Sequence, residues 1–323
     1  MTAGYARGVP KDWSRRGFLA MTATVAATAA ACRSEKPGAV SDDGSVTVKH
    51  MFGETRVPAP PTRVVSAGYT EQDDLLAVGV VPIAVTNWFG DQPFGVWPWA
   101  TPKLGGAQPE VLDLSDGIQL DRIAALKPDL IVATNAGVDE ATYQKLSELA
   151  PTIAQSGQDA FFEPWKTQAA TISHAVFKYD EMARIVQAVD DKFAGVGKTN
   201  PQFAGKKVLL LRGTLADDAV EVVTPPWRGE FLTQMGLTIA DAGDGRIARD
   251  RMEEVLAAAD ALIWTTESDD QQAALLADPT IAKLGRRHVF TGKDLSGAIA
   301  FSSPLSYPVV ADQLPPALAK VLG

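Results

Sequence analysis

The sequence predicts an α/β protein of two lobes joined by one long helix, and three observations lead to this prediction. Short apolar runs that end at small residues alternate with helical segments, a pattern typical of buried parallel strands and their connecting helices. This order of elements occurs twice along the chain. Between the two occurrences lies a stretch, residues 164–198, in which apolar residues recur three, four or seven positions apart, as on one face of a helix.

The first lobe is predicted over residues 46–163. Gly79 and Pro128 mark the ends of its two expected helices, because glycine is a common helix C-cap and the residue before a proline disfavours the helical conformation. The expected strands are 63–68, 80–86 and 129–134, and the expected helices are 72–78 and 120–126.

The second lobe is predicted over residues 200–323 and repeats the plan of the first. Its segment 255–264 has the same helix-to-strand order as segment 123–132, so two lobes of similar architecture are expected. The expected strands are 207–212, 237–241 and 261–266, and the expected helices are 229–235 and 252–258.

Residues 164–199 form the linker in this scheme. A single helix here would be about 50 Å long, and Pro164 suits its first turn. Such a helix would be a stiff connector between the lobes.

The N-terminal residues 1–31 have the three parts of a secretory signal. Arg15 and Arg16, followed by Phe18-Leu19, resemble the twin-arginine export signal. The uncharged stretch 17–31 is shorter than the roughly 20 residues that a membrane-spanning helix needs. We therefore expect this leader to direct export and to be absent from the folded domain.

Cys32 is the only cysteine and directly follows three alanines at the end of the apolar stretch. This position resembles a lipobox, which implies that Cys32 is lipidated and that residues 32–45 are a flexible, lipidated tether to the membrane. Leucine is usual in the family pattern where Ala29 stands. The alternative is cleavage by an ordinary signal peptidase, which would leave a free thiol.

Charge and motifs exclude several classes of function. Without residues 1–31 the chain has a net charge of about −12 and no Lys/Arg cluster, which argues against binding to nucleic acid. The sequence has no nucleophile elbow, no HExxH motif and no phosphate-binding glycine loop, so we do not expect an enzyme. An exported hydrolase and an envelope scaffold protein are the alternatives from other classes.

Several stretches of the chain resemble the iron-siderophore branch of ABC-transporter substrate-binding lipoproteins, the FecB-like branch. They are residues 61–80, 88–94, 96–99, 123–132 and 300–305. The resemblance implies two Rossmann-like lobes of the class III periplasmic-binding-protein type. It also implies a monomer on the outer face of the cytoplasmic membrane that needs no cofactor. Such a protein would deliver a ferric siderophore, or alternatively haem, to an ABC importer permease.

Ligand-binding residues are expected where strands end, because ligands of open parallel sheets bind beyond the carboxyl ends of the strands. Tryptophans in loops are further candidates, since a large ring in a loop either packs underneath or faces a ligand. Packing is the alternative for each of the rings, and a turn is the alternative for Asn135. The expected ligand-binding residues are Tyr69, Thr70, Trp88, Trp97, Asn135, Phe161, Trp165, Arg212, Trp227, Trp264 and Glu267.

Tyr69 directly follows the first strand of the predicted sheet. A tyrosine phenolate is a known ligand of haem iron, so Tyr69 is a candidate iron ligand. The alternative is a neutral phenol that stacks on the bound molecule or hydrogen bonds to it. The three histidines have no metal-ligand spacing, so a bare metal ion is not the expected substrate.

Two arginines could bind a carboxylate or propionate with two hydrogen bonds. Arg212 ends a predicted strand and is expected at the cleft, whereas solvation at the surface is the default for Arg228. Family resemblance also implies one permease-docking acid on each lobe. Asp73 and Glu253 match these positions, with Glu71 and Asp74 as alternatives to Asp73.

Overall fold

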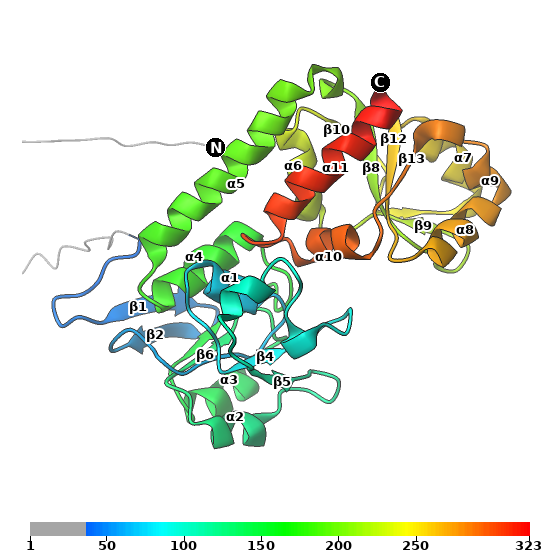
Figure 1. The fold of residues 1–323 in the computed structure, drawn as a ribbon. Coiled ribbons are helices and arrows are strands. Elements are labelled where there is room, and N and C mark those ends of the chain that lie inside the picture. The colour runs from blue at the N-terminus through cyan, green and yellow to red at the C-terminus, as the bar shows by residue number, and fades with distance from the viewer. Residues whose placement is uncertain (1–36) are drawn as a thin grey trace, which may run out of the picture. The chain divides into compact units, whose positions relative to one another are not determined.

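The computed structural model describes residues 37–323 of the chain (Figure 1). The predicted leader 1–31 and Cys32 lie outside the described residues. Within 37–323, no helix is both long enough and apolar enough to cross a lipid bilayer.

The N-terminal lobe is built on a parallel sheet of five short strands in the order β5-β4-β3-β6-β7. All residues of the central strands β3 and β6 are buried, as expected for a parallel sheet covered on both faces. The strands are β3 (Val64–Ser66), β4 (Ala84–Thr86), β5 (Glu110–Leu112), β6 (Leu130–Ala133) and β7 (Thr152–Ala154). The helices are α1 (Glu71–Ala77), α2 (Leu120–Leu126) and α3 (Glu140–Ser147), with 3-10 turns η1 (Pro93–Gly95) and η2 (Thr101–Leu104).

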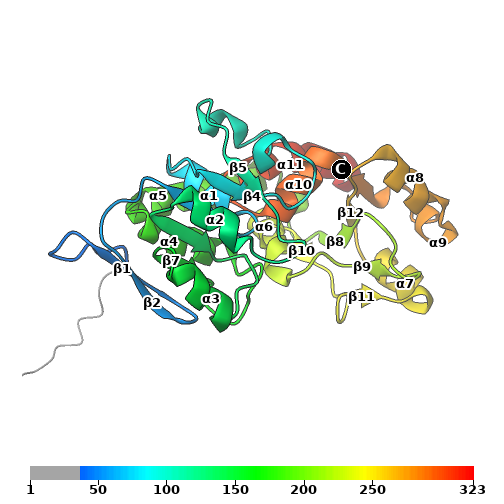
Figure 2. The same ribbon diagram turned by 90° about the horizontal axis from the view of Figure 1, so that it is seen from below.

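An antiparallel hairpin, β1 (Val46–His50) and β2 (Gly53–Val57), precedes this sheet and lies at the edge of the lobe (Figure 2). The residues just before it are not free chain. Asp43 caps Ser45 and forms an ion pair of 2.6 Å with Arg56 of β2. The predicted flexible tether therefore ends earlier than residue 45, because this turn is hydrogen-bonded to the hairpin.

The C-terminal lobe has a four-stranded parallel sheet in the order β10-β8-β12-β13 and a small antiparallel ribbon of two further strands. The strands are β8 (Lys207–Arg212), β9 (Val220–Glu221), β10 (Thr238–Ile239), β11 (Arg246–Ile247), β12 (Ala261–Thr265) and β13 (His288–Phe290). The helices are α6 (Glu230–Gln234), α7 (Arg249–Ala257), α8 (Asp269–Ala277), α9 (Pro279–Ala282), α10 (Lys293–Phe301) and α11 (Tyr307–Leu322), with 3-10 turns η3 (Pro201–Phe203), η4 (Pro226–Gly229) and η5 (Gly285–Arg287).

The linker consists of two helices, α4 (Trp165–Ala175) and α5 (Tyr179–Thr199), so the prediction of one uninterrupted helix is wrong. Phe177 has a positive φ of 62°, and the amide of Lys178 donates to the carbonyl of Ser173. This left-handed residue with its backward hydrogen bond is a common way to end a helix. The apolar spacing skips at Phe177, which is the signal of the break in the sequence.

The linker helices contribute to the cores of both lobes: α4 adds Trp165 to the C-terminal core, and α5 adds Met182 to the N-terminal core. Ala169 and Ile172 of α4 pack with the buried residues of β1, β3 and α1. Val189 and Phe193 of α5 pack with β8, α6 and α11. Burial of these apolar faces holds both helices in place, and α5 runs from one lobe to the other (Figure 1).

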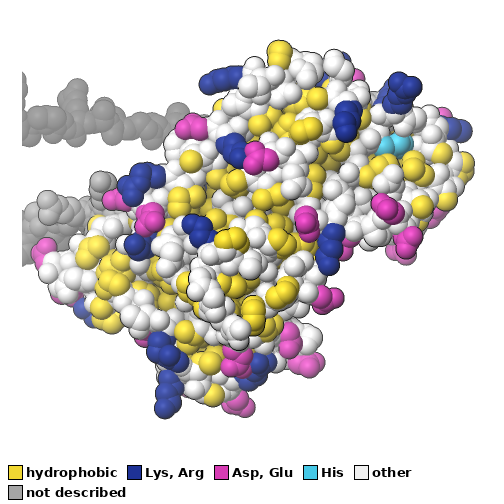
Figure 3. Space-filling view, in the orientation of Figure 1, with side chains coloured by type: hydrophobic (Ala, Val, Ile, Leu, Met, Phe, Trp, Pro, Cys, Tyr) yellow, Lys and Arg dark blue, Asp and Glu magenta, His cyan; other side chains and the backbone are white. Residues whose placement is uncertain are grey.

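Charged side chains are distributed over the surface. On the face drawn in Figure 3, Lys and Arg side chains are scattered among Asp and Glu rather than gathered in one patch. This agrees with the absence of a basic cluster in the sequence.

Candidate functional site

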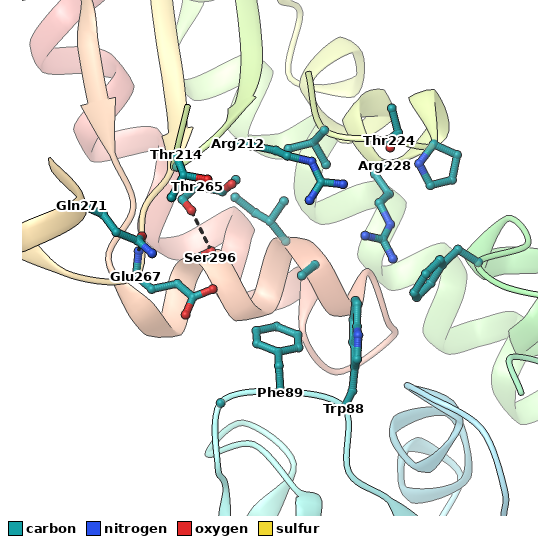
Figure 4. Close-up of a pocket in the computed structure, with 17 residues that line it drawn as sticks. Trp88, Phe89, Arg212, Thr214, Thr224, Arg228, Thr265, Glu267, Gln271 and Ser296 are labelled. Carbon is teal, nitrogen blue, oxygen red and sulfur yellow. Dashed lines mark hydrogen bonds between the residues drawn. The ribbon is translucent and has the colours of Figure 1, made fainter. Parts of the chain in front are cut away.

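A cavity of about 470 Å³ lies between the two lobes (Figure 4). Trp88, Phe89 and Phe162 line it from the N-terminal side. From the C-terminal lobe it is lined by the last residues of two strands, Arg212 of β8 and Thr265 of β12, and by neighbouring loops and helix α10. The cavity is thus at the carboxyl ends of the second sheet, where open α/β sheets bind ligands, and its volume suits a small molecule.

Trp88, Phe89 and Phe162 form what we call the aromatic wall. The ring of Trp88 is 4.6 Å from that of Phe89 and 5.0 Å from that of Phe162, measured between centroids. Trp88 also contacts Phe301 of α10 at 5.7 Å, so the wall packs directly on the C-terminal lobe. These tilted and edge-on contacts are the favoured geometries of aromatic pairs, and they hold a large apolar surface at the cavity.

Tyr69 lies behind this wall rather than in the lining of the cavity. Its ring stacks between Trp88 at 5.6 Å and Phe161 at 5.8 Å. Burial raises the pKa of the Tyr69 phenol above its usual value, and the negative charge of Asp113 adds to this. Both features favour a neutral phenol that supports Trp88, and iron ligation by Tyr69 stays a prediction.

Arg228 is a buried polar group in the lining of the cavity. It follows Pro226 and Trp227 in η4, and only 6% of the residue is exposed. Its guanidinium carbon lies 4.4 Å from the ring centre of Phe162 and 5.6 Å from that of Trp88. Burial lowers the pKa of Arg228 to about 10, so the side chain stays positively charged at neutral pH. The expectation that Arg228 is solvated at the surface is therefore wrong.

Arg212 and Glu267 line the cavity as predicted for strand ends, and both are exposed. The Arg212 guanidinium forms an ion pair of 3.3 Å with Glu221, which also lies 3.5 Å from Arg246. Ser296 of α10 donates a hydrogen bond to the carbonyl of Thr265 (Figure 4). The C-terminal lobe therefore presents charged side chains of both signs to the cavity.

In the N-terminal lobe, the polar groups at the strand ends bind one another. The buried carboxylate of Glu71 accepts hydrogen bonds from the amides of Gly68 and Asn135, both at 2.9 Å. The hydroxyls of Ser66 and Thr134 donate to it as well, each at 3.2 Å. Glu71 thereby ties the end of β3 to the end of β6, and we call this arrangement the Glu71 clamp.

Asn135 and Thr70 belong to the same network. The Asn135 side chain donates to the carbonyl of Tyr69 at 2.8 Å and accepts from the amide of Phe162 at 2.8 Å. Thr70 has a positive φ of 67°, and its hydroxyl accepts from Asn135 and Gln168 at 3.1 Å each. Neither residue lines the cavity. The prediction of direct ligand contact is therefore wrong for both, and they position the aromatic wall instead.

Asp73 is completely buried, so its predicted contact with a permease is wrong. Its carboxylate accepts a hydrogen bond of 2.8 Å from the indole of Trp99 and another from Ser303, which follows α10. Burial raises the pKa of Asp73 to about 6. The two alternatives, Glu71 and Asp74, are also at most 1% exposed. Apolar packing of α1 beneath α4 and η2 buries this whole helix.

Three predicted tryptophans belong to cores instead of the cavity lining. Trp97 stacks on Trp99 at 4.9 Å and is 1% exposed, Trp165 packs on Tyr307 at 5.1 Å, and Trp264 is fully buried. The Trp264 indole donates to the ring of His288 at 3.0 Å. Each lies under a loop or within a sheet, where its large apolar area is removed from water.

Two further aromatic residues lie beside the cavity. The Trp227 indole donates to the carbonyl of Phe162 at 3.1 Å, which connects the lobes next to Arg228. Phe161 is 42% exposed and covers Tyr69. Phe89, Phe162 and Arg228 are among the lining residues that the list of expected ligand-binding residues leaves out. For Arg228 the clearest signal in the sequence is the preceding Trp227, because tryptophan is highly buried on average.

Comparison with known proteins agrees with this architecture. Residues 64–285 match the model of a family described as periplasmic binding protein. The crystal structure of a periplasmic solute binding protein from Mycobacterium smegmatis str. MC2 155 is 64% identical and superposes with a TM-score of 0.85, covering 87% of this chain and 100% of that chain.

Curated relatives are more distant. YhfQ of Bacillus subtilis (strain 168) is 28% identical over 67% of this chain, and the Fe(3+) dicitrate-binding periplasmic protein FecB of Escherichia coli (strain K12) is 27% identical over 64%. The chain spans 65% and 66% of the lengths of these two relatives, just under two thirds in each case. The matched family model covers most of both lobes and the linker between them. The chain belongs to the periplasmic binding protein family.

Proposed function

We propose that this protein binds a ferric siderophore in the cavity between its lobes and delivers it to the permease of an ABC importer. The observation that carries the proposal is the cavity itself, lined by the aromatic wall and by the guanidinium of Arg228, which lies against that wall. Aromatic faces suit the flat apolar parts of an iron chelate, and a guanidinium suits its oxygen donors. Because the siderophore supplies the oxygens that hold the iron, the protein needs no iron ligand of its own.

The names of the relatives support this class of substrate. They include proteins named for Fe(3+) dicitrate and for Fe(3+)-hydroxamate complexes. These two ligands differ in charge and shape, so the relatives support an iron chelate without choosing one. The choice depends on residues of this chain.

Tryptophan fluorescence tests the proposal directly. Ferric complexes quench nearby indoles, and Trp88 lines the cavity, so titration with ferric siderophores should produce saturable quenching. Trp88→Ala should weaken binding about tenfold or more, since central aromatic contacts dominate binding energy. Leu149→Ala, an exposed residue after α3, is the matched control and should bind like the wild type. The proposal fails if no ferric siderophore produces saturable quenching, and saturable quenching by haem alone would contradict it in favour of haem.

We further propose Asp121 and Glu253 as the pair of acids that meets the permease, with Asp121 taking the place expected for Asp73. Both are exposed, on α2 and α7. In the internal repeat each stands two residues before a buried aliphatic residue, Ile123 and Val255. The two positions are therefore equivalent in the two lobes. Such a pair suits a docking surface that uses one acid from each lobe.

Charge reversal tests this pair. The double variant Asp121→Lys/Glu253→Lys should abolish iron uptake by cells while leaving the affinity of the purified protein for its ligand unchanged. Glu148→Lys/Glu254→Lys changes charge equally on the two lobes and should support normal uptake. Normal uptake by the first double variant would contradict the assignment.

We also propose that the protein is exported by the twin-arginine route and anchored through lipidated Cys32. Support comes from the Arg15-Arg16 motif and from the place of Cys32 at the end of the apolar stretch. Radioactive fatty acid should label the wild type and leave Cys32→Ser unlabelled. Equal labelling of both would contradict the anchor.

A further inference from the structure

Helix α10 of the C-terminal lobe contacts both lobes. One of its faces packs in the core of its own lobe, through Leu295 and Ala298. Gly297 and Phe301 are four residues apart, so they share another face of the helix, and this face contacts loop 88–99 of the N-terminal lobe. The same helix also lines the cavity, so it joins the ligand site to the contact between the lobes.

The ring of Phe301 is surrounded by four aromatic rings of loop 88–99, which we call the Phe301 socket. The centroid distances are 5.6 Å to Trp99, 5.7 Å to Trp88, 6.0 Å to Trp97 and 6.1 Å to Phe89. The contacts are tilted or edge-on, which aromatic pairs favour, and only 3% of Phe301 is exposed. Trp88 and Phe89 also belong to the aromatic wall, so Phe301 supports the wall from behind.

Gly297 allows the same loop to approach the helix closely. A Cβ atom at this position would lie 2.4 Å from a ring carbon of Trp97, which is closer than two carbon atoms can approach without a shift. Trp97 is 1% exposed and stacks on Trp99 at 4.9 Å, so its ring can move away only if the loop moves with it. The contact therefore requires glycine, although glycine weakens the interior of a helix.

A carboxylate fixes this contact further. Asp73 accepts a hydrogen bond from the indole of Trp99 in the Phe301 socket and another from the hydroxyl of Ser303, two residues after Phe301. Hydrogen bonds depend on direction as well as distance, so Asp73 limits how far the socket can slide along α10.

We propose that Gly297 and Phe301 are positioning residues of the ligand site, which fix loop 88–99 to α10 and thereby set the places of Trp88 and Phe89 in the cavity. Figure 4 shows both side chains pointing from this loop towards α10. Neither Gly297 nor Phe301 lines the cavity, so they act on the ligand through the aromatic wall. The effect on affinity rests on the proposed function, whereas the attachment of the loop does not.

Hydrogen exchange measured by mass spectrometry tests the attachment without a ligand. Gly297→Ala should speed the exchange of amides in residues 95–103 about tenfold or more, because the added Cβ pushes the loop away from α10. Gly195→Ala is the matched control, since it lies in α5 and its added Cβ would meet no atom within 4 Å. The control should exchange like the wild type in this loop. Exchange in Gly297→Ala that equals that of the wild type would overturn the proposal.

Affinity then connects the attachment to the ligand site. The probes are ferric enterobactin, ferric citrate and ferrichrome, titrated by tryptophan fluorescence. Phe301→Ala should reduce the affinity for the tightest-binding probe about tenfold or more, because the wall loses its support. Phe301→Met should stay within about threefold of the wild type, since a flexible thioether keeps contact with aromatic rings.

A second core ring separates positioning from a purely structural role. Phe203 of η3 is fully buried and packs beside α11. Phe203→Ala should lower the melting temperature while leaving the affinity within about threefold of the wild type, because distant sites act independently. Equal losses of affinity in Phe203→Ala and Phe301→Ala would overturn the positioning role.

The outcomes separate this proposal from the proposed function. If the wild type binds no ferric siderophore, the proposed function fails, and hydrogen exchange still decides whether the loop is fixed by Gly297. If the wild type binds while Gly297→Ala and Phe301→Ala bind equally tightly, only the positioning role fails. Thermal unfolding shows whether each variant is folded. If Phe301→Ala is not, Phe301→Leu replaces it, because leucine keeps apolar volume and loses the ring contacts.

Discussion

At the ends of its strands, the N-terminal lobe uses its polar groups internally, whereas the C-terminal lobe directs its polar groups towards the cavity. Glu71 and Asn135 have hydrogen-bond partners within their own lobe. Arg212, Arg228 and Glu267 line the cavity from the other lobe. The N-terminal lobe therefore supplies a fixed aromatic surface, and the C-terminal lobe supplies the charges that can distinguish ligands.

The internal use of polar groups in the N-terminal lobe agrees with the burial of three acidic side chains there. Glu71, Asp73 and Asp74 are all buried in α1, and burial raises the pKa of each. Glu71 holds Asn135, whose side chain accepts from the amide of Phe162 in the aromatic wall, and Asp73 accepts a hydrogen bond from Ser303 of the other lobe. Support of the aromatic wall and recognition of the ligand thus depend on different residues, so substitutions can test the two roles one at a time.

The largest effect on stability is expected from Trp97→Ala. Trp97 is almost fully buried in the same loop as Trp88, and its ring packs on Trp99, Phe89 and Phe301. Loss of this ring should lower the free energy of unfolding by about 3–5 kcal/mol through the cavity that it leaves. Chemical denaturation measures this. Trp88→Ala should lower the free energy of unfolding by less, because Trp88 lines the cavity. Equal losses for the two variants would show that the two rings do not differ in role.

Glu71→Leu should lower the free energy of unfolding by about 2–4 kcal/mol, because the buried amides of Gly68 and Asn135 lose their acceptor. The leucine has a similar size, so packing changes little. Glu254→Leu on the exposed face of α7 is the control and should stay within about 0.5 kcal/mol of the wild type. An equal response of the two variants would contradict the Glu71 clamp.

Asp73→Asn should become more stable relative to the wild type as the pH rises. Burial raises the pKa of Asp73 to about 6, so the folded protein holds this proton more tightly than the unfolded chain. The resulting stabilisation is complete below the unfolded pKa and is lost as the pH rises through about 6. The asparagine does not titrate, so between pH 4 and pH 8 the variant should gain about 1–3 kcal/mol on the wild type.

The stability of the variant must be compared with that of the wild type at each pH, because two histidines also titrate in this range. Burial lowers the pKa values of His50 and His288, so they destabilise the folded protein as the pH falls and oppose the effect of the acids. Both remain in the variant and cancel in the difference. A difference between Asp73→Asn and wild type that does not change with pH would show that Asp73 is not the group that titrates.

Much of the fold was predictable because buried parallel strands and their connecting helices leave local patterns of apolar residues in the sequence. The strand at 207–212 and the helix at 120–126 occur with the predicted bounds, since apolar runs and their terminating residues are local signals. The break at Phe177 was not predicted, because it depends on a left-handed residue that the periodicity shows only as a skip. The hairpin partner β2 was missed because its few buried residues give little contrast.

The site was less predictable, because burial in a cavity depends on packing between distant segments. Trp88 and Trp97 lie in the same loop, and the sequence does not show which ring faces the cavity and which lies beneath it. An arginine is usually exposed, so the sequence alone predicted a surface position for Arg228. The structure buries it against Trp88 and Phe162 of the N-terminal lobe. Asp73 was assigned by spacing alone, which carries no information on what covers α1.

The central claim is that the ligand lies in the cavity lined by the aromatic wall and by Arg228, which packs against that wall. Crystals of the protein with its tightest-binding ferric complex, measured at the iron absorption edge, locate the iron by anomalous scattering. We predict one strong peak inside the cavity, with an oxygen pair of the complex hydrogen-bonded to the guanidinium of Arg228. An iron peak outside this cavity, or a complex that leaves Arg228 without an oxygen partner, would contradict the account.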